Sequence, residues 1–321
     1  MILNLSRNLT KKLKLFGISF VVFSSALSLM ILLPNSLDLA ESKINSRNEV
    51  FKQPILLAGD VQAESTQSSL QKIDLNIKAP TTTANSVYIK DLTTGDILFK
   101  KNSETRVPMA STTKIMTALV ATEHFKSGDI LLVPPEALVG GSNMGLIAGE
   151  YMTFRSLLYG MLLNSGNDAA FTVAANYPGG IYEFVNAMNQ KAGSLGLKNT
   201  NFTNPAGFDN PYHYTSSEDM AEIATEFTKH PTLSKVVSTK ETSVISFDKT
   251  KSHPLKNLNK LLGTDGVVGI KTGFTEIAGE NLVALVDRDG HKILTVVLNS
   301  NDRFGESKAL IDWVFKNFKW E

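Results

Sequence analysis

The chain has 321 residues, of which 42% are hydrophobic, and its formal net charge is +1. It is long enough to bury a substantial hydrophobic core, and its charged residues are too mixed in sign to form a nucleic-acid-binding surface. The absence of cysteine excludes a disulfide framework, a thiolate nucleophile and a cysteine-ligated zinc site. The five histidines are scattered and form no H-E-x-x-H motif, so we expect no metal site.

The N-terminus predicts an export signal or a membrane anchor. Residues 1–14 carry four basic side chains and precede the uncharged segment Leu15–Pro34. As a helix this segment would be about 30 Å long, which matches a bilayer core, and its basic flank would stay in the cytoplasm. It exceeds the apolar run of a cleavable signal, and Asp38 disfavours cleavage after Ala40. We therefore expect a retained anchor at residues 15–34, with a cleaved signal peptide as the alternative.

A polar segment separates this apolar stretch from the folded part of the chain. Residues from Glu41 to Ala79 are rich in Ser, Gln, Lys and Asn and contain few apolar side chains. This composition is typical of a solvated tether. We therefore predict a disordered linker over residues 35–79 and one catalytic domain over residues 80–321.

Short β-prone runs lie at the two ends of the predicted domain. The first two flank a Thr93-Thr94-Gly95-Asp96 turn signal, and the last two flank Asp287-Arg288-Asp289-Gly290, so each pair predicts a hairpin. The five runs are Val87–Leu92, Ile97–Phe99, Gly266–Gly273, Asn281–Val286 and Ile293–Leu298.

The intervening pattern is helical. Apolar residues dominate 109–120 and 157–163, and they recur every three to four residues over 181–195. Thr215 and Glu218 form a capping-box pattern for a helix through Ile223, and Ala309–Phe318 predicts a closing helix. These elements predict an α/β (α+β) domain in which both ends build one antiparallel sheet, flanked by helices and carrying a helical insertion.

Ser111-Thr112-Thr113-Lys114 is the first of three motifs that supply groups for acyl transfer. Pro108 favours a helix start, so Ser111 would lie in the first turn with Lys114 on the same face. The apolar surroundings favour a neutral lysine, which would accept the serine proton, and a helix N-terminus favours an oxyanion. The alternative is an ordinary helix start with a solvated lysine, since two further S-x-x-K matches, at 69–72 and 246–249, occur in the chain.

Ser165-Gly166-Asn167 follows the apolar run 157–163 and precedes Asp168, which we expect to be the N-cap of another helix. A small polar turn between two buried helices would direct Ser165 and Asn167 inward. Ser165 would then relay a proton to the leaving amine, and Asn167 would hold a substrate peptide group or Lys114. A simple helix-to-helix turn is the alternative.

Lys271-Thr272-Gly273 occurs once, at the end of a glycine-rich strand. Lys271 and Thr272 offer donors to a carboxylate, and Gly273 leaves room for a ligand along the strand edge. The N–H of Phe274 would form an oxyanion hole with that of Ser111. An ordinary strand end remains the alternative.

The three motifs together resemble the serine-type D-alanyl-D-alanine carboxypeptidases, which are low-molecular-mass penicillin-binding proteins. The resemblance covers roughly residues 84–318. Besides the motifs, it rests on the lead-in 106–111, the segments 163–170 and 201–207, His213-Tyr214-Thr215, the run 269–275 and the final helix from Arg303.

The resemblance implies a β-lactamase/transpeptidase-like fold and a role for each motif. Ser111 would be the acylated nucleophile and Lys114 its base, with Ser165 and Asn167 in the proton network. Lys271, Thr272 and Arg303 would bind the terminal carboxylate of the substrate. The implied substrate is the D-Ala-D-Ala end of peptidoglycan stem peptides, β-lactams would acylate the same serine, and no cofactor is implied.

Two alternatives share the motifs. A serine β-lactamase of class A needs a glutamate in an E-x-x-x-N motif after the second box, and none occurs there. A non-catalytic β-lactam sensor would be expected to carry a damaged motif, and all three are intact. Many relatives continue into a β-rich domain with a C-terminal membrane helix, whereas this sequence ends at Glu321. We therefore expect anchoring through the N-terminal segment at the outer face of the bacterial cell membrane.

Overall fold

The computed structural model describes residues 72–320. The predicted membrane segment at 15–34 and residues 35–71 of the predicted linker lie outside the described residues. Within 72–320, no helix is both long enough and apolar enough to cross a bilayer.

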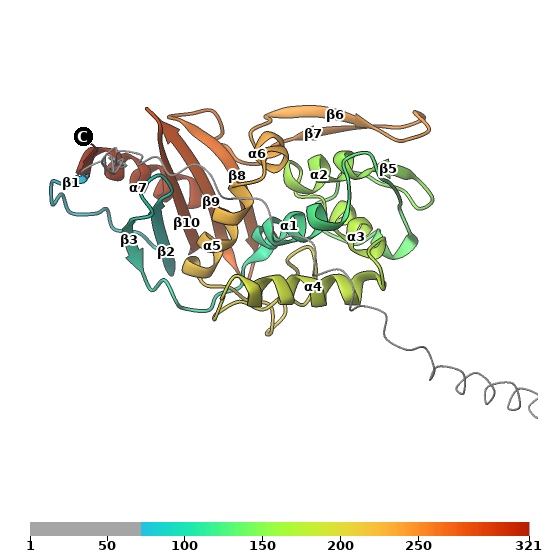
Figure 1. The fold of residues 1–321 in the computed structure, drawn as a ribbon, viewed down its shortest axis with the longest axis horizontal. Coiled ribbons are helices and arrows are strands. Elements are labelled where there is room, and N and C mark those ends of the chain that lie inside the picture. The colour runs from blue at the N-terminus through green and yellow to red at the C-terminus, as the bar shows by residue number, and fades with distance from the viewer. Residues whose placement is uncertain (1–71, 321) are drawn as a thin grey trace, which may run out of the picture. The chain divides into compact units, whose positions relative to one another are not determined.

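A five-stranded antiparallel sheet forms the centre of the domain (Figure 1). Its strand order is β3-β2-β10-β9-β8, so strands from both ends of the domain pair with each other and β8 lies at one edge. The two predicted hairpins and the predicted antiparallel sheet are confirmed. The strands are β2 (Ser86–Asp91), β3 (Ile97–Lys101), β8 (Val267–Thr275), β9 (Gly279–Arg288) and β10 (His291–Ser300).

Both faces of the sheet are buried, because side chains along each strand alternate between two cores. On β10, Leu294 and Val296 belong to the larger core with the helical insertion. Ile293 and Val297 belong to a second core, which α7 (Arg303–Asn317) covers on the other face. The sheet therefore lies between α7 and the remaining helices (Figure 1).

The helical insertion between β3 and β8 carries two of the three motifs. It comprises η1 (Ala110–Thr113), α1 (Lys114–His124), α2 (Phe154–Leu162), α3 (Asn167–Ala175), α4 (Gly180–Ser194), α5 (Ser217–Thr228) and α6 (Pro231–Val237). The predicted helix at 109–120 thus begins as a short 3-10 turn, which contains Ser111, before the α-helix starts at Lys114.

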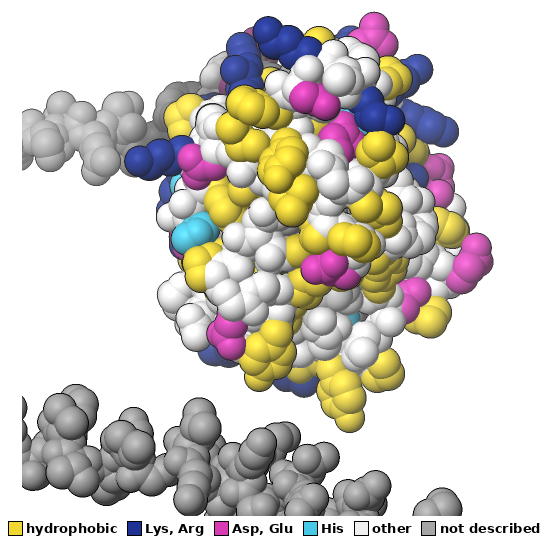
Figure 2. All heavy atoms as spheres, turned by 90° about the vertical axis from the view of Figure 1, so that its right-hand side faces the viewer, with side chains coloured by type: hydrophobic (Ala, Val, Ile, Leu, Met, Phe, Trp, Pro, Cys, Tyr) yellow, Lys and Arg dark blue, Asp and Glu magenta, His cyan; other side chains and the backbone are white. Residues whose placement is uncertain are grey.

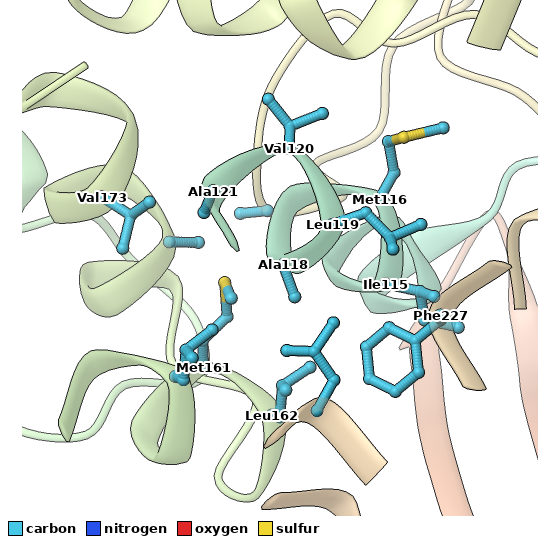
Figure 3. Packing of buried hydrophobic residues seen from close by; sticks show 14 of the residues in the cluster. Ile115, Met116, Ala118, Leu119, Val120, Ala121, Met161, Leu162, Val173 and Phe227 are labelled. Carbon is cyan, nitrogen blue, oxygen red and sulfur yellow. The ribbon is translucent and has the colours of Figure 1, made fainter. Parts of the chain in front are cut away.

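The α1 helix is surrounded by apolar side chains. Figure 3 shows Met161 and Leu162 from α2, Val173 from α3 and Phe227 from α5 around its buried residues. Eight consecutive residues from Lys114 onward are buried. A charged group at the start of this helix is therefore held away from bulk water.

The folded chain begins earlier than the composition predicted. Lys72–Asp74 form β1, which pairs with β11 (Phe318–Trp320), and the amide of Leu75 donates to Asn317 O at 2.9 Å. Trp313 Nε1 donates to Ile77 O at 2.7 Å. The prediction of a disordered linker is therefore wrong for residues 72–77, because their partners come from the far end of the chain.

Two short hairpins of the insertion were not predicted. They are β4 (Ile130–Leu132) with β5 (Tyr151–Thr153) and β6 (Glu241–Ile245) with β7 (Ser252–Lys256), and a 3-10 turn, η2 (Pro135–Ala137), follows β4. Figure 2 shows the end of the domain that they form, where hydrophobic side chains interleave with charges of both signs. The described surface in this view thus carries no continuous basic stripe.

Helix starts differ in detail from the prediction. Ser216, rather than Thr215, caps α5, and its side chain accepts from the amide of Asp219. The α3 helix begins at Asn167 with Gly166 as its N-cap, so Asp168 is not a cap. The α7 helix begins at Arg303, and the Asp302 side chain caps it. At α5 the neighbouring serine takes the cap position in place of Thr215, because both residue types can accept from the first turn.

Candidate active site

Ser111 and Lys114 contact each other at the junction of η1 and α1. Lys114 Nζ lies 2.9 Å from Ser111 Oγ. The same amine donates to Asn167 Oδ1 at 2.8 Å and to Ala206 O at 2.7 Å. These three oxygens hold Lys114 Nζ in a fixed position beside the hydroxyl.

The environment of Lys114 favours a neutral amine. Its side chain is 0% exposed, and burial lowers its pKa well below the usual value for lysine, with the charge of Lys271 as the next cause. Asp168 opposes this shift through its negative charge. A neutral amine has a free lone pair and can accept the Ser111 proton.

Two glycines allow other backbones to approach η1 closely. A side chain at Gly207 would collide with the carbonyl group of Ala110, and Gly207 has a φ of +96°. A Cβ at Gly273 would lie 3.2 Å from Ser111 N. Ala110 itself adopts a φ of 46°. The serine is therefore held on a sharp turn between the segment that ends at Gly207 and the edge strand β8.

The Ser165 motif lies between α2 and α3, as predicted, and its side chains contact the lysines of the other two motifs. Ser165 is 3% exposed and has a φ of 60°, and its Oγ accepts from Lys271 Nζ at 2.9 Å. Asn167 accepts from Lys114 and donates through Nδ2 to Gly140 O at 2.8 Å. Each motif therefore contacts a residue of another motif.

Asp168 holds the neighbouring loop instead of capping a helix. Its carboxylate accepts from the amides of Met144, Gly145 and Leu146 at 3.0–3.1 Å. The amide of Asn167 also donates to Ser142 O at 2.7 Å. The loop at 142–146 is thus fixed against the start of α3 beside the cleft.

Lys271 lies on β8 and is 1% exposed. Burial and the charge of Arg303 lower its pKa to about 7. Its Nζ donates to Ser165 Oγ and to Thr272 O, both at 2.9 Å. The neutral form of Lys271 is therefore more accessible near neutral pH than that of an exposed lysine, and an arriving carboxylate would favour its charged form.

The remaining predicted carboxylate ligands lie on or beside β8. Thr272 is 5% exposed, and Arg303 Nη1 donates to Gly273 O at 2.8 Å. Arg303 Nε is buried without a hydrogen-bond partner among residues 72–320. Phe274 is half exposed, and it follows Gly273 on the edge strand next to Ser111. All nine predicted site residues thus lie in one group, joined by direct contacts or by adjacency on β8.

Sequence reasoning missed one supporting group, the carbonyl of Ala206, which accepts from Lys114. The neighbouring Gly207 was its only signal in the sequence. His213, which belongs to the resemblance, has its Nε2 2.7 Å from Thr113 Oγ1 in η1. Among the described residues, no three His, Asp or Glu side chains gather in a metal-binding arrangement.

Comparisons with known proteins agree with this geometry. A family model described as D-alanyl-D-alanine carboxypeptidase matches residues 74–302. The Streptomyces K15 DD-transpeptidase structure aligns with a TM-score of 0.71 and 31% identity, over 75% of this chain and 100% of that one. The transpeptidase-like fold predicted from the sequence is therefore confirmed. The chain belongs to peptidase family S11, the D-alanyl-D-alanine carboxypeptidases.

Curated relatives carry matching names. D-alanyl-D-alanine carboxypeptidase DacF of Bacillus subtilis is 35% identical over 246 residues, which cover 74% of this chain and 63% of the relative. D-alanyl-D-alanine carboxypeptidase DacC of Escherichia coli is 32% identical, over 76% of this chain and 64% of the relative. A D-alanyl-D-alanine endopeptidase of Pseudomonas aeruginosa is 34% identical, over 71% of this chain and 74% of the relative. The chain thus spans slightly less than two thirds of the length of the first two of these relatives.

Proposed function

We propose that this protein is a serine D-alanyl-D-alanine carboxypeptidase that removes the terminal D-alanine from peptidoglycan stem peptides. The observation that carries the proposal is the buried amine of Lys114, which lies 2.9 Å from Ser111 Oγ and close enough to Lys271 of β8 for its charge to affect the pKa of Lys114. Family membership supports the same substrate class.

In the acylation step, Lys114 Nζ takes the proton of Ser111 Oγ as this oxygen attacks the carbonyl carbon of the penultimate D-alanine. The carbonyl oxygen becomes an oxyanion, which the N–H groups of Ser111 and Phe274 stabilise. The C–N bond then breaks, and the proton passes through Ser165 to the leaving amine. The products are a Ser111 ester and free D-alanine.

In the deacylation step, water attacks the ester carbonyl. Lys114 takes a proton from this water, and the Ser111 oxygen leaves and regains a proton. Before acylation, the carboxylate of the terminal D-alanine binds to Lys271, Thr272 and Arg303. Arg303 Nε offers a donor that no residue of 72–320 uses. A β-lactam, which carries a carboxylate beside a reactive amide, would acylate Ser111 in the same way and deacylate slowly.

The proposed location is the extracytoplasmic face of the cell membrane, where peptidoglycan is found. It rests on the family and on the basic and apolar sequence of residues 1–34. Membrane attachment through this segment is part of the proposal.

The β-lactamase alternative has little support. Glu183, which follows the second motif in sequence, lies on α4 and accepts a hydrogen bond from Asn186 at 3.3 Å. Asp168 accepts from the amides of the 142–146 loop. Neither carboxylate hydrogen-bonds to Ser111 or Lys114 among the described contacts, so neither is placed to activate water at the ester.

The test uses the full-length chain in detergent. Diacetyl-L-Lys-D-Ala-D-Ala should release D-alanine, benzylpenicillin should form a long-lived adduct, and nitrocefin should turn over slowly. Ser111→Ala should abolish labelling, and Lys114→Met should slow acylation by about 10²–10⁴-fold while the chain stays folded. Lys126→Met, at an exposed position, is the control. Rapid nitrocefin turnover, or adduct formation without peptide turnover, would contradict the proposal.

A further inference from the structure

A pocket with a volume of about 610 Å³ opens beside the proposed active site. It lies between the segment that leads to Ser111, the loop at 209–214 and the turn after β8. Its lining includes Arg106, Pro108, Asp209, Tyr212, Tyr214 and Ile277. None of these residues has a role in the chemistry described above.

The direction of a bound peptide follows from the proposed site. The terminal carboxylate would lie at Lys271 and Thr272, and the scissile carbonyl would lie at the N–H of Phe274. A peptide on the free edge of β8 therefore runs antiparallel to the strand, and its upstream residues pass Thr275 toward Ile277. At about 3.4 Å per residue, the residue before the two D-alanines reaches the mouth of this pocket.

A hydrogen bond joins the pocket to this strand end. Thr275 Oγ1 donates to Asp209 Oδ1 at 2.8 Å. The loop that carries Asp209 is therefore attached to β8 at the point where a bound peptide would leave the strand edge.

The pocket contains one positive and one negative side chain. The guanidinium of Arg106 is fixed by Asn199 Oδ1 at 3.1 Å, by Lys198 O at 3.2 Å and by the ring of Tyr214 at 4.8 Å. These contacts use Nε and Nη2, and no hydrogen bond of Nη1 is found among residues 72–320. Neither Arg106 nor Asp209 takes part in an ion pair within the described part of the chain.

Two of the side chains that line the pocket expose apolar surface. Tyr212 is 72% exposed and Ile277 is 67% exposed, so both offer uncovered apolar surface to a ligand. An aliphatic chain would lie against them, and a charged end would reach Arg106 and Asp209. A ligand with both an amine and a carboxylate at its end satisfies both charges, whereas a lysine satisfies only Asp209.

We propose that this pocket binds the side chain of the third stem-peptide residue and selects a diamino dicarboxylic acid over lysine. Arg106 binds the distal carboxylate and Asp209 the distal amine. This proposal rests on the proposed function, and it makes Arg106 and Asp209 specificity-determining residues of that site.

The experiment compares three pentapeptides, acetyl-L-Ala-γ-D-Glu-X-D-Ala-D-Ala, with the full-length chain in detergent. X is meso-diaminopimelate, its ε-amide or L-lysine. We expect kcat/KM for the diaminopimelate peptide to exceed that for the ε-amide and lysine peptides by about 10-fold, which is the order expected for one charge-assisted pair. Arg106→Gln should remove this advantage and leave kcat/KM for the lysine peptide within about twofold of the parent value. Asp209→Asn should lower kcat/KM for all three peptides.

Two matched controls are available. Arg155 is exposed and stacks on Tyr159 at 5.9 Å, and Asp248 is exposed and accepts from Thr250 Oγ1 at 2.9 Å. Arg155→Gln and Asp248→Asn should leave the ratios unchanged. Benzylpenicillin labelling of every variant shows whether the cleft is intact.

The outcomes separate this proposal from the proposed function. If the parent chain cleaves all three peptides at rates within twofold, or Arg106→Gln slows them equally, the pocket has no such role although the carboxypeptidase stands. If no peptide releases D-alanine, both proposals fail. If Arg106→Gln does not fold, the ratios of kcat/KM among the three peptides, measured with the parent chain and with Arg106→Lys, decide the question.

Discussion

Lys114 and Lys271 are two buried amines in one site, and each contacts a different serine. Lys114 Nζ lies 2.9 Å from Ser111 Oγ, and Lys271 Nζ lies 2.9 Å from Ser165 Oγ. The charge of Lys271 contributes to the lowered pKa of Lys114, after burial. The lysine that would bind the substrate carboxylate thus also helps to keep the proposed base neutral.

Removing the charge at position 271 should make Lys114 easier to protonate. In Lys271→Gln, the pKa of Lys114 rises, because the like-charge repulsion is gone while burial remains. The acid limb of the pH profile for benzylpenicillin acylation should then move to higher pH, besides any fall in the maximal rate. Stopped-flow or gel-based labelling between pH 4 and 9 measures this midpoint. Lys126→Gln should leave it in place, and an unmoved midpoint in Lys271→Gln would show that the two amines are not coupled.

Arg303 should control the alkaline limb of the pH profile of kcat/KM for the tripeptide. Its charge helps to lower the pKa of Lys271 to about 7, so the free enzyme loses the positive Lys271 as pH rises through that value. In Arg303→Gln the pKa of Lys271 should rise, and the alkaline midpoint of kcat/KM for the tripeptide should move upward. KM should increase as well, because a carboxylate donor is lost.

The matched control for this variant is Arg288→Gln. Both guanidinium groups stack on a phenylalanine, at 4.9 Å for Arg303 on Phe304 and 4.5 Å for Arg288 on Phe315. Arg288 is the last residue of β9, next to the turn that leads into β10, and is not among the site residues. A raised KM without a shifted midpoint would assign Arg303 to substrate binding alone.

Gly273 should be needed for the position of Ser111. An alanine Cβ there would lie 3.1 Å from Met109 O, 3.2 Å from Ala110 Cβ and 3.2 Å from Ser111 N. Since the first and third neighbours are backbone atoms of the turn that holds the nucleophile, Gly273→Ala should push this turn away from β8. We expect acylation to slow by about 10- to 100-fold, since small misplacements of reacting groups are costly. Gly193→Ala on α4, where a Cβ meets nothing within 4 Å, should retain full activity and gain up to about 1 kcal/mol in stability.

Much of the catalytic arrangement was predictable, because it depends on local patterns. The spacing of Ser111 and Lys114 places both on one side of a helical turn, and this holds although the turn is 3-10 in form. The alternation of apolar residues at both ends of the domain predicted the antiparallel sheet. Placing Lys271 on a strand of this sheet then brought it to the same region of the molecule, although it lies in the middle of β8 and not at the predicted strand end.

The remainder depends on contacts between distant segments. Ala206 O accepts from Lys114 across 92 positions in the sequence, and a carbonyl group leaves no mark in the residue pattern. Likewise, β1 forms because β11 provides a partner, not because residues 72–74 have a strong β pattern. Asp168 was expected to cap a helix, and it instead binds three amides of a loop that precedes it by more than twenty positions. Such pairings are fixed only by the assembled fold.

His213 should make folding stability depend on pH. Its Nδ1 accepts from the amide of Thr203 at 3.0 Å, so the proton lies on Nε2, which donates to Thr113 Oγ1 at 2.7 Å behind the nucleophile. Burial, followed by the charge of Lys114, lowers the pKa of His213 to about 4. An unfolded histidine takes up its proton near pH 6.5. Between these values the unfolded chain binds more protons, so the free energy of unfolding falls as the pH is lowered.

Over this window His213 should account for about 3 kcal/mol of lost stability. Urea unfolding of the full-length chain at pH 7.5, 6.0 and 5.0 measures the trend. His213→Gln should be less stable than the parent at pH 7.5, because at most one of the two ring hydrogen bonds survives, but its stability should decline less on acidification. His124→Gln, at an exposed site on α1, should decline as the parent does. An equal decline in His213→Gln would place the acid sensitivity elsewhere in the fold.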